Sequence, residues 1–72
     1  MNQKTAQKKA QRAVDDWNAK YPVGQKVMVH RDNGVDFPTI TRSEAQVLSG
    51  HSPVVWIEGI AGCYHLDFVE AI

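Results

Sequence analysis

The sequence has little cysteine and no long hydrophobic run. Cys63 is the only cysteine among the 72 residues, so the chain cannot form an internal disulfide bond. No stretch approaches the roughly 20 apolar residues that a membrane-spanning helix needs. The start of the chain is rich in lysine and has no apolar signal-peptide core. We therefore expect a soluble, cytoplasmic protein without a membrane partner.

The sequence also lacks a complete metal-binding or catalytic motif. Cys63 and His65 lie two positions apart and share one face of a strand. Three more residues could join them as metal ligands, namely His30, His51 and Asp67, but structural zinc sites usually have four ligands in recognisable pairs. A thiol beside an imidazole could act as nucleophile and base, yet no motif supplies an orienting group or an oxyanion hole. We predict that the protein is not an enzyme and holds no metal or cofactor.

The composition is that of a folded domain. Hydrophobic residues make up 43% of the chain, and there is no low-complexity tract. A chain of 72 residues makes one domain and buries only about 60% of its unfolded surface. We therefore expect a single domain over residues 1–72, with modest stability of its own or help from self-association.

The first part of the chain has the period of an amphipathic helix. Apolar residues recur at steps of three and four, at Ala6, Ala10, Ala13, Val14, Trp17 and Tyr21. Pro22 disfavours helical geometry at the residue before it, and Gly24 follows. This pattern predicts a helix over residues 2–21, with its aromatic second half anchored on the rest of the domain.

From Gln25 onward the pattern changes to short strands. Val27 and Val29 alternate with other residues, and Asn33-Gly34 favours a tight reversal because both residues tolerate a positive φ. A second strand follows, and because proline cannot donate to a ladder, this strand either lies at a sheet edge or begins after Pro38.

The second half predicts a short helix and further strands. Ser43 with Gln46 three residues later is typical of a capping box, which favours a helical insert over residues 43–48. Residues 54–57 are apolar on both faces, as in a central strand. The segment 63–66 follows a glycine-bracketed turn, and the tail 67–72 is expected to form a packed turn or a final strand.

These elements predict the α+β class. We expect an N-terminal amphipathic helix followed by a small antiparallel SH3-like β-barrel of four or five short strands over residues 25–72, with the helical insert bridging two of them. A barrel of this kind largely removes unpaired strand edges. Trp17 would cap one open end. An open antiparallel sheet covered by the long helix is the alternative.

Several short motifs resemble a group of small proteins of bacterial phages, prophages and plasmids. The motifs lie between about residues 18 and 70 and are Tyr21-Pro22-Val23-Gly24, Thr41-Arg42-Ser43-Glu44-Ala45, Leu48-Ser49-Gly50-His51, Pro53-Val54-Val55-Trp56-Ile57-Glu58-Gly59, Gly62 and Leu66. The group has no known function, so the resemblance implies a mobile-element context and says nothing about chemistry. Host-modulating and counter-defence roles are common among such proteins.

Charge is divided between the two halves of the chain. Seven of the eight Lys and Arg residues lie up to Arg31, and six of the eight Asp and Glu residues follow it. The basic helix start could contact a nucleic-acid backbone through Lys4, Lys8, Lys9 and Arg12. These bases are few, and the acidic half would repel DNA. The same split would let the basic helix lie against the acidic half of another copy or of the same copy, and the first arrangement would make a homo-oligomer.

A second candidate site surrounds Arg42, the only base after Arg31. Thr41 and Ser43 flank it at the predicted helix start, where two hydroxyl groups, free N–H groups and a guanidinium could hold a phosphate or a carboxylate. Pairing of Arg42 with nearby acids is the simpler interpretation. We predict a non-enzymatic module that binds a protein through the barrel rim and the loops 32–36 and 48–53, the latter containing His51. Nucleic-acid binding by the helix is the alternative.

Overall fold

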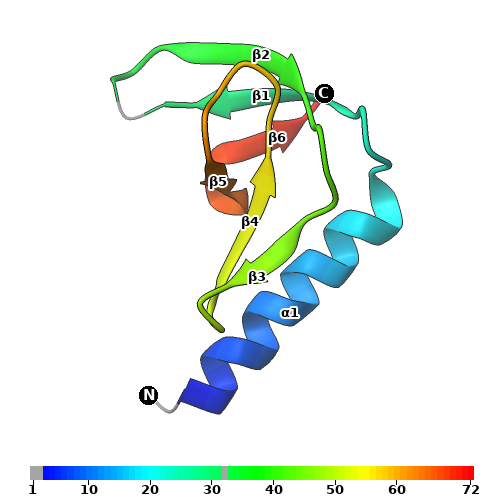
Figure 1. Ribbon diagram of the computed structural model, residues 1–72, viewed down its shortest axis with the longest axis vertical. Helices are drawn as coiled ribbons and strands as arrows, with labels where there is room; N and C mark the ends of the chain where they lie inside the picture. Colours follow the sequence, from blue (N-terminus) through cyan, green and yellow to red (C-terminus); the bar gives the residue numbers. More distant parts are fainter. Residues whose placement is uncertain (1–2, 32) are drawn as a thin grey trace.

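The computed structural model describes residues 3–31 and 33–72, with side chains from Ala6 onward (Figure 1). Within these residues one helix precedes six strands and a short 3-10 helix. The elements are α1 (Gln3–Lys20), β1 (Lys26–His30), β2 (Asp36–Ile40), β3 (Gln46–Leu48), β4 (Ser52–Trp56), β5 (Cys63–His65), η1 (Leu66–Phe68) and β6 (Val69–Ala71). The α+β class predicted from the sequence is confirmed.

Helix α1 carries the apolar stripe that the sequence predicts. Val14 is buried, and Trp17 packs half-buried against the core. The N–H of Tyr21 donates to the carbonyl of Trp17 (2.8 Å), and the proline that follows ends the helix. The helix predicted over residues 2–21 therefore ends one residue earlier than expected, and Asn2 lies outside the described residues. This helix is not long and apolar enough to cross a membrane.

Strands β2, β1 and β6 form an antiparallel sheet with β1 in the middle. The β1–β2 hairpin turns where the sequence predicts. Gly34 has a φ of +80°, and its N–H donates to the carbonyl of Arg31 (3.0 Å). Pro38 lies in β2 opposite Met28. Since β2 is an edge strand of this sheet, the missing N–H of Pro38 is tolerated there, which is the first of the two alternatives expected from the sequence.

Residues 43–48 do not form the predicted helix. Their second half is strand β3, which pairs with β4. The hydroxyl group of Ser43 donates to the carbonyl of Glu44 (3.1 Å) and caps no helix. So short a segment gains few helical hydrogen bonds for the cost of nucleation. The strand satisfies the backbone through the ladder and lets Val47 pack against the core, so tertiary pairing overrides the capping signal.

Strands β3, β4 and β5 form a second antiparallel sheet, with β4 in the centre as predicted. A tight turn joins β3 to β4. Ser49 and Gly50 both have positive φ (55° and 77°), and the N–H of His51 donates to the carbonyl of Leu48 (3.2 Å). This is the geometry of a type I′ hairpin turn, which matches the twist of the flanking strands. Gly50 therefore lies in the turn of a hairpin between two strands.

Strands β2 and β3 behave as one bent strand that joins the two sheets. After β2, Thr41 pairs with Ile57 in an isolated bridge, and the N–H of Arg42 donates to the carbonyl of Trp56 (3.0 Å). Pairing with β4 then resumes at β3 with its register shifted by two residues. Residues 43–45 therefore form a bulge, which lets the strand turn from one sheet into the other.

The bulge is held by the helix. The side-chain amide of Asn18 donates to the carbonyl of Ala45 (3.1 Å), and its oxygen accepts the N–H of Ala45 (2.9 Å). Asn18 thus satisfies both backbone groups of a buried residue that has left the ladder. Helix α1 lies against β3 and β4 in consequence (Figure 1).

The two sheets remain open in the part of the chain that the structure describes. There β5 pairs only with β4, and β6 pairs only with β1. Closure of the expected SH3-like barrel is therefore not observed among these pairings, and six strands are present where four or five were expected. The extra strand is β3, which replaces the predicted helical insert.

The hydrophobic core lies where the two sheets and the helix meet. Val27 and Val29 from β1 are fully buried, as are Val55 from β4 and Ile57 just beyond it. The helix adds Val14 to this cluster. The alternation of Val27 and Val29 with exposed neighbours is the period-two pattern that predicted β1.

Gly59 occupies a turn where a side chain would collide with the core. Its φ is +82°, and an added Cβ would lie 3.1 Å from Cζ of Phe37. Gly62 has a nearly identical φ of +81° but nothing within 4 Å. We expect Gly62→Ala to lower the free energy of unfolding by about 1 kcal/mol and Gly59→Ala by about 2 kcal/mol. Urea denaturation of both variants checks this, and equal losses would show that the Phe37 contact costs nothing.

Candidate functional site

The hydroxyl group of Thr41 is committed to the fold. Thr41 is 2% exposed, and its hydroxyl oxygen accepts the N–H groups of Gly24 (3.1 Å) and Gln25 (3.2 Å). Its own N–H donates to the carbonyl of Gln25 (3.0 Å). Thr41 therefore fastens the turn after α1 to the bent strand, and its hydroxyl group does not face a ligand.

The anion site predicted around Arg42 loses the helix on which it depended. The backbone of Arg42 belongs to the junction between the sheets, while its side chain is exposed. Ser43 donates its hydroxyl group to a neighbouring carbonyl. The free N–H groups of a helix N-terminus are not available at this place, because residues 43–45 are a bulge. Arg42 supplies the one charged side chain of that prediction, and it remains exposed.

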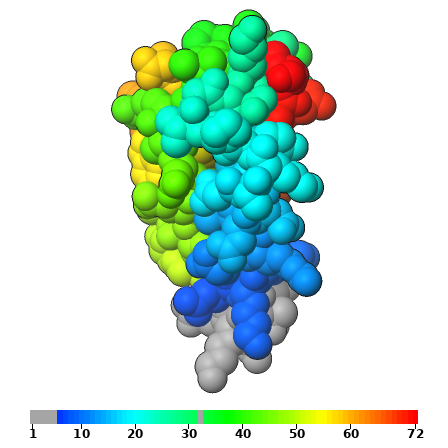
Figure 2. Space-filling view, turned by 90° about the vertical axis from the view of Figure 1, so that its right-hand side faces the viewer, coloured from blue at the N-terminus to red at the C-terminus, as the bar shows by residue number. Residues whose placement is uncertain are grey.

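The basic residues of the helix are exposed. Lys8, Lys9 and Arg12 lie on the turns of α1 that form the blue lower part of the face in Figure 2. The side chain of Lys4 lies outside the described residues. Each ion pair recorded in the described part of the chain has a histidine as its base. These three bases therefore keep their charges available to solvent or to a partner.

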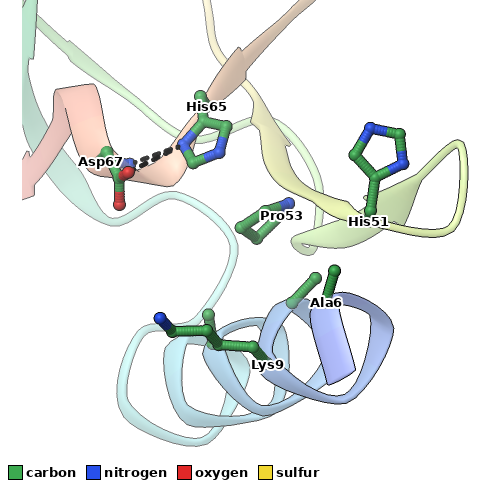
Figure 3. Close-up of a pocket in the computed structure, with 8 residues that line it drawn as sticks. Ala6, Lys9, His51, Pro53, His65 and Asp67 are labelled. Carbon is green, nitrogen blue, oxygen red and sulfur yellow. Dashed lines mark hydrogen bonds and ion pairs between the residues drawn. The ribbon is translucent and has the colours of Figure 1, made fainter. Parts of the chain in front are cut away.

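A pocket lies between the first half of α1 and the second sheet, and it brings two of the predicted site residues together. Its volume is about 320 Å³. We call it the helix–hairpin pocket. Lys9 comes from the helix and His51 from the β3–β4 turn (Figure 3). The other residues that line it are Ala6, Ala10, Ala13, Pro53, His65 and Asp67.

The two histidines of the pocket are held in opposite tautomers by their hydrogen bonds. Nδ1 of His51 lies 2.9 Å from the carbonyl oxygen of Ser49, so it carries the ring proton and donates. Nδ1 of His65 accepts the N–H of Asp67 (3.1 Å) and so has no proton in the neutral ring. Oδ2 of Asp67 lies 3.6 Å from that nitrogen, beyond hydrogen-bond distance. The neutral ring of His65 therefore carries its proton on Nε2.

The sequence suggested His65 and Asp67 as partners of Cys63 in a metal site, and His65 also as a base beside the Cys63 thiol. In the structure, no group of three or more such side chains among the described residues could hold a metal ion. Cys63 is half-buried on β5, and it does not line the pocket. The pocket itself was missed because it depends on the packing of the helix against a hairpin whose first strand the sequence predicted as a helix.

A second exposed surface is the side of sheet β2-β1-β6 that faces away from the core, here called the outer sheet face. Lys26 and His30 of β1 point to this side, since the residues between them alternate with the core. Ile40 stands opposite Lys26, and the N–H of Ile72 donates to the carbonyl of Lys26 (3.0 Å). The outer sheet face consists of Lys26, Met28, His30, Asp36, Pro38, Ile40, Glu70 and Ile72.

The outer sheet face has an apolar part and a charged end. Ile40 and Ile72 are 40% and 60% exposed, and Met28 lies in the next row of the sheet beside Pro38. At the other end, Nδ1 of His30 lies 3.0 Å from Oδ1 of Asp36, and its Nε2 lies 3.5 Å from Oε1 of Glu70. The histidine therefore bridges the acids of the two strands beside β1.

The two acids change the titration of His30. The hydrogen bond to Asp36 is the largest cause and, with the charges of Asp36 and Glu70, raises the pKa of His30 above its ordinary value of 6.5. A pKa that is higher in the folded than in the unfolded state means that folding favours the protonated form. The stabilisation is therefore complete below the unfolded pKa and is lost as the pH rises through the folded pKa.

We expect His30→Gln to remove this pH dependence. The unfolding midpoint of the natural protein should fall relative to that of His30→Gln as the pH is raised from about 5.5 to about 8.5, because only the natural protein loses a charged pair. Urea midpoints of both proteins across this range check the result. Arg31→Gln, a change at an exposed neighbouring base, serves as the control and should keep the pH dependence. Parallel curves for the natural protein and His30→Gln would contradict the prediction.

Comparison of the chain with protein families, curated proteins and solved structures finds no match.

Proposed function

We propose that the protein is a non-enzymatic binding module that recognises another protein through the outer sheet face. The observation that carries this proposal is the apolar part of that face, where Ile40 and Ile72 are exposed beside Met28. Helix α1 lies on the other sheet and does not cover it. Lys26 stands between the two isoleucines, and exposed apolar groups interspersed with charge are typical of non-obligate protein interfaces.

The loop 32–36 also favours recognition through the outer sheet face. It ends at Asp36, a member of the outer sheet face, and Val35 in it is 59% exposed. Asp32 lies outside the described residues. The loop 48–53 belongs to the other sheet, beside the helix–hairpin pocket (Figures 1 and 3). The two loops predicted to act together therefore border different surfaces, and we assign protein recognition to the first.

Two further parts of the proposal concern the type of fold and the origin of the protein. We propose an SH3-like arrangement, because the paired strands follow the order β6, β1, the bent strand β2–β3, β4 and β5, with a 3-10 turn between the last two strands in the chain. We also propose a mobile-element origin with a host-modulating or counter-defence role in the cytoplasm. That part rests on the short motifs that resemble small phage and plasmid proteins.

Site-specific photocrosslinking in host cells tests the function. A photoreactive residue at Ile40 is expected to capture a discrete partner, and Ile72→Glu in the same chain is expected to abolish the capture. The same residue at Val23, which is 56% exposed outside this face, is the matched control and should capture nothing specific. An identical product from both positions, or none from Ile40, would contradict the proposal. A product formed only from Leu48 would assign recognition to the second loop instead.

The alternative function is contact with a nucleic-acid backbone by the helix. It is favoured by the exposure of Lys8 and Arg12, one turn apart on α1. If this is the function, binding of duplex DNA should weaken steeply with salt, and Lys8→Gln with Arg12→Gln should reduce the slope of the logarithm of the binding constant against the logarithm of salt concentration by about 2. Lys20→Gln, at an exposed base at the far end of the helix, is the control. No detectable binding at low salt would exclude this alternative.

A further inference from the structure

We propose that the helix–hairpin pocket is a binding site for a small monocarboxylate with a short apolar chain. The proposal goes beyond the protein-recognition function, because the pocket adjoins the second sheet and shares no residue with the outer sheet face. It is carried by three features of the pocket together: its volume beside apolar side chains, hydrogen-bond donors from two different elements that line it, and a single compensating acid.

The pocket exists because the helix carries small side chains where it faces the hairpin. Ala6, Ala10 and Ala13 form its helical side, and Pro53 of β4 faces them. Ala10 is only 3% exposed, so this side of the pocket is walled by apolar atoms. An unfilled volume of about 320 Å³ matches the lower range of small-molecule sites. An apolar chain placed there would replace water with the contacts that alanine is too small to make.

The polar groups of the pocket suit a carboxylate. The hydrogen bond from Asp67 leaves Nε2 of His65 as the protonated ring nitrogen, and Figure 3 shows His65 and His51 on either side of Pro53, above the helix. Lys9 supplies a cation from the helix side and forms no ion pair recorded in the described part of the chain. One N–H donor and one ammonium group are a complement for the two oxygens of a carboxylate.

The acid at the pocket selects the charge of the ligand. Asp67 lines the pocket beside His65, so the formal charges of Lys9 and Asp67 balance. A dianion such as a phosphate monoester would be repelled by Asp67 and met by only one lysine, whereas a monoanion would be repelled less. The hydrogen bond of His51 to Ser49 holds the opposite wall in place. Among anions, these charges favour a carboxylate over a phosphate monoester.

A titration of the protein with hexanoate, followed by two-dimensional NMR of the backbone amides, tests the proposal. We expect saturable shifts at Ala6, Ala10 and Asp67 with a Kd on the order of 1 mM. Hexanamide, which has the same shape without the charge, should bind about tenfold more weakly. Absence of saturable shifts at the pocket up to roughly 50 mM hexanoate would overturn the proposal. Equal binding of the amide would overturn the assignment to a carboxylate.

Three variants separate the contributions of the pocket. Lys9→Gln should weaken hexanoate about tenfold and leave hexanamide unchanged, whereas Lys8→Gln, at an exposed lysine that does not line the pocket, should change neither. Asp67→Asn should improve the binding of hexyl phosphate relative to hexanoate. Ala6→Leu should fill the pocket and block both ligands. If Lys9→Gln and Lys8→Gln weaken hexanoate equally, the pocket is not the site.

The outcome can be read separately from that of the proposed function. Ala6→Leu and Lys9→Gln do not touch the outer sheet face, so capture of a partner from Ile40 should be unaffected by either variant. An unchanged amide spectrum away from the pocket shows that each variant is folded. Loss of hexanoate binding with an intact spectrum therefore reports on the pocket, and loss of photocrosslinking reports on the outer sheet face.

Discussion

Replacing Ile57 with alanine is expected to lower the free energy of unfolding by about 3 kcal/mol. Ile57 is 1% exposed, and it is the residue whose bridge to Thr41 joins the two sheets. Its side chain lies in the same buried cluster as Val29 and Val55. Removing it leaves a cavity at the point where both sheets pack, and the backbone pairing prevents a full collapse around it. For a domain of 72 residues, a total of roughly 4–10 kcal/mol is typical, so a large share would be lost.

Urea denaturation of Ile57→Ala measures this loss. Ile40→Ala removes the same atoms at a site that is 40% exposed and is the matched control, with an expected cost below about 1 kcal/mol. Ile57→Val should cost about 1 kcal/mol, because it deletes a single methyl group. Similar losses for the two alanine variants would contradict the central place of Ile57 in the core.

Asn18→Ala is expected to cost about 2–3 kcal/mol, although it removes no large apolar group. The Asn18 amide accepts the N–H of Ala45 (2.9 Å) and donates to its carbonyl (3.1 Å). Ala45 is 3% exposed, so the substitution leaves two backbone groups without a partner and without ready access to water. The helix would also lose the polar contact that holds it at the bulge.

Equilibrium denaturation together with amide hydrogen exchange tests this prediction. The amide of Ala45 should lose protection more than amides elsewhere in the sheets. Gln11→Ala, which breaks an exposed bond from Gln11 to Asp15 (2.9 Å) on the same helix, is the control and should cost less than about 0.5 kcal/mol. Asn18→Asp keeps an acceptor for the N–H of Ala45, but its carboxylate would face the carbonyl oxygen of Ala45. This variant should therefore recover little of the lost stability. If Asn18→Ala costs no more stability than the control, water must hydrogen-bond the N–H and carbonyl of Ala45 in the variant.

The elements that could be predicted from the sequence are those whose signals are local or periodic. The alanine and aromatic stripe of α1 predicted both the helix and the face that it buries, because a helix repeats every 3.6 residues. Val27 and Val29 predicted the strand that lies in the middle of the first sheet, and Pro38 limited the next strand to a sheet edge or to a start after the proline. Each of these inferences needs only the geometry of one element.

The segment 43–48 shows a case in which the local sequence pattern predicts the wrong structure. Ser43 and Gln46 have the spacing of a capping box, but β4 offers this segment a complete ladder and Asn18 offers Ala45 both of its hydrogen bonds. Asn18 lies 27 positions away from Ala45 in the chain. The ladder with β4 depends on the hairpin turn at Ser49-Gly50, which the capping-box pattern does not take into account. The candidate anion site was built on the same capping box, and it loses its N–H donors for the same reason.

The candidate sites also depend on contacts between segments that are distant in the sequence. Lys9 and His51 were singled out separately, one for a basic helix face and the other for a loop, and only the packing of α1 beside the hairpin brings them to one pocket with His65. The outer sheet face depends on the pairing of β6 with β1, which places Glu70 beside His30. At this place two acids from the acidic half of the chain, Asp36 and Glu70, contact His30 from the basic half.

The order of amino acids determined the helix, the turns, most strands and the division of charge, because each depends on residues within a few positions of one another. The tertiary structure decided the bent strand, the open pair of sheets, the pocket and the outer sheet face. These features depend on contacts such as those of Thr41 with Ile57 and of Asn18 with Ala45, which join distant parts of the chain. Such contacts form only when the backbone groups of one segment find partners in another, and that choice depends on the whole fold.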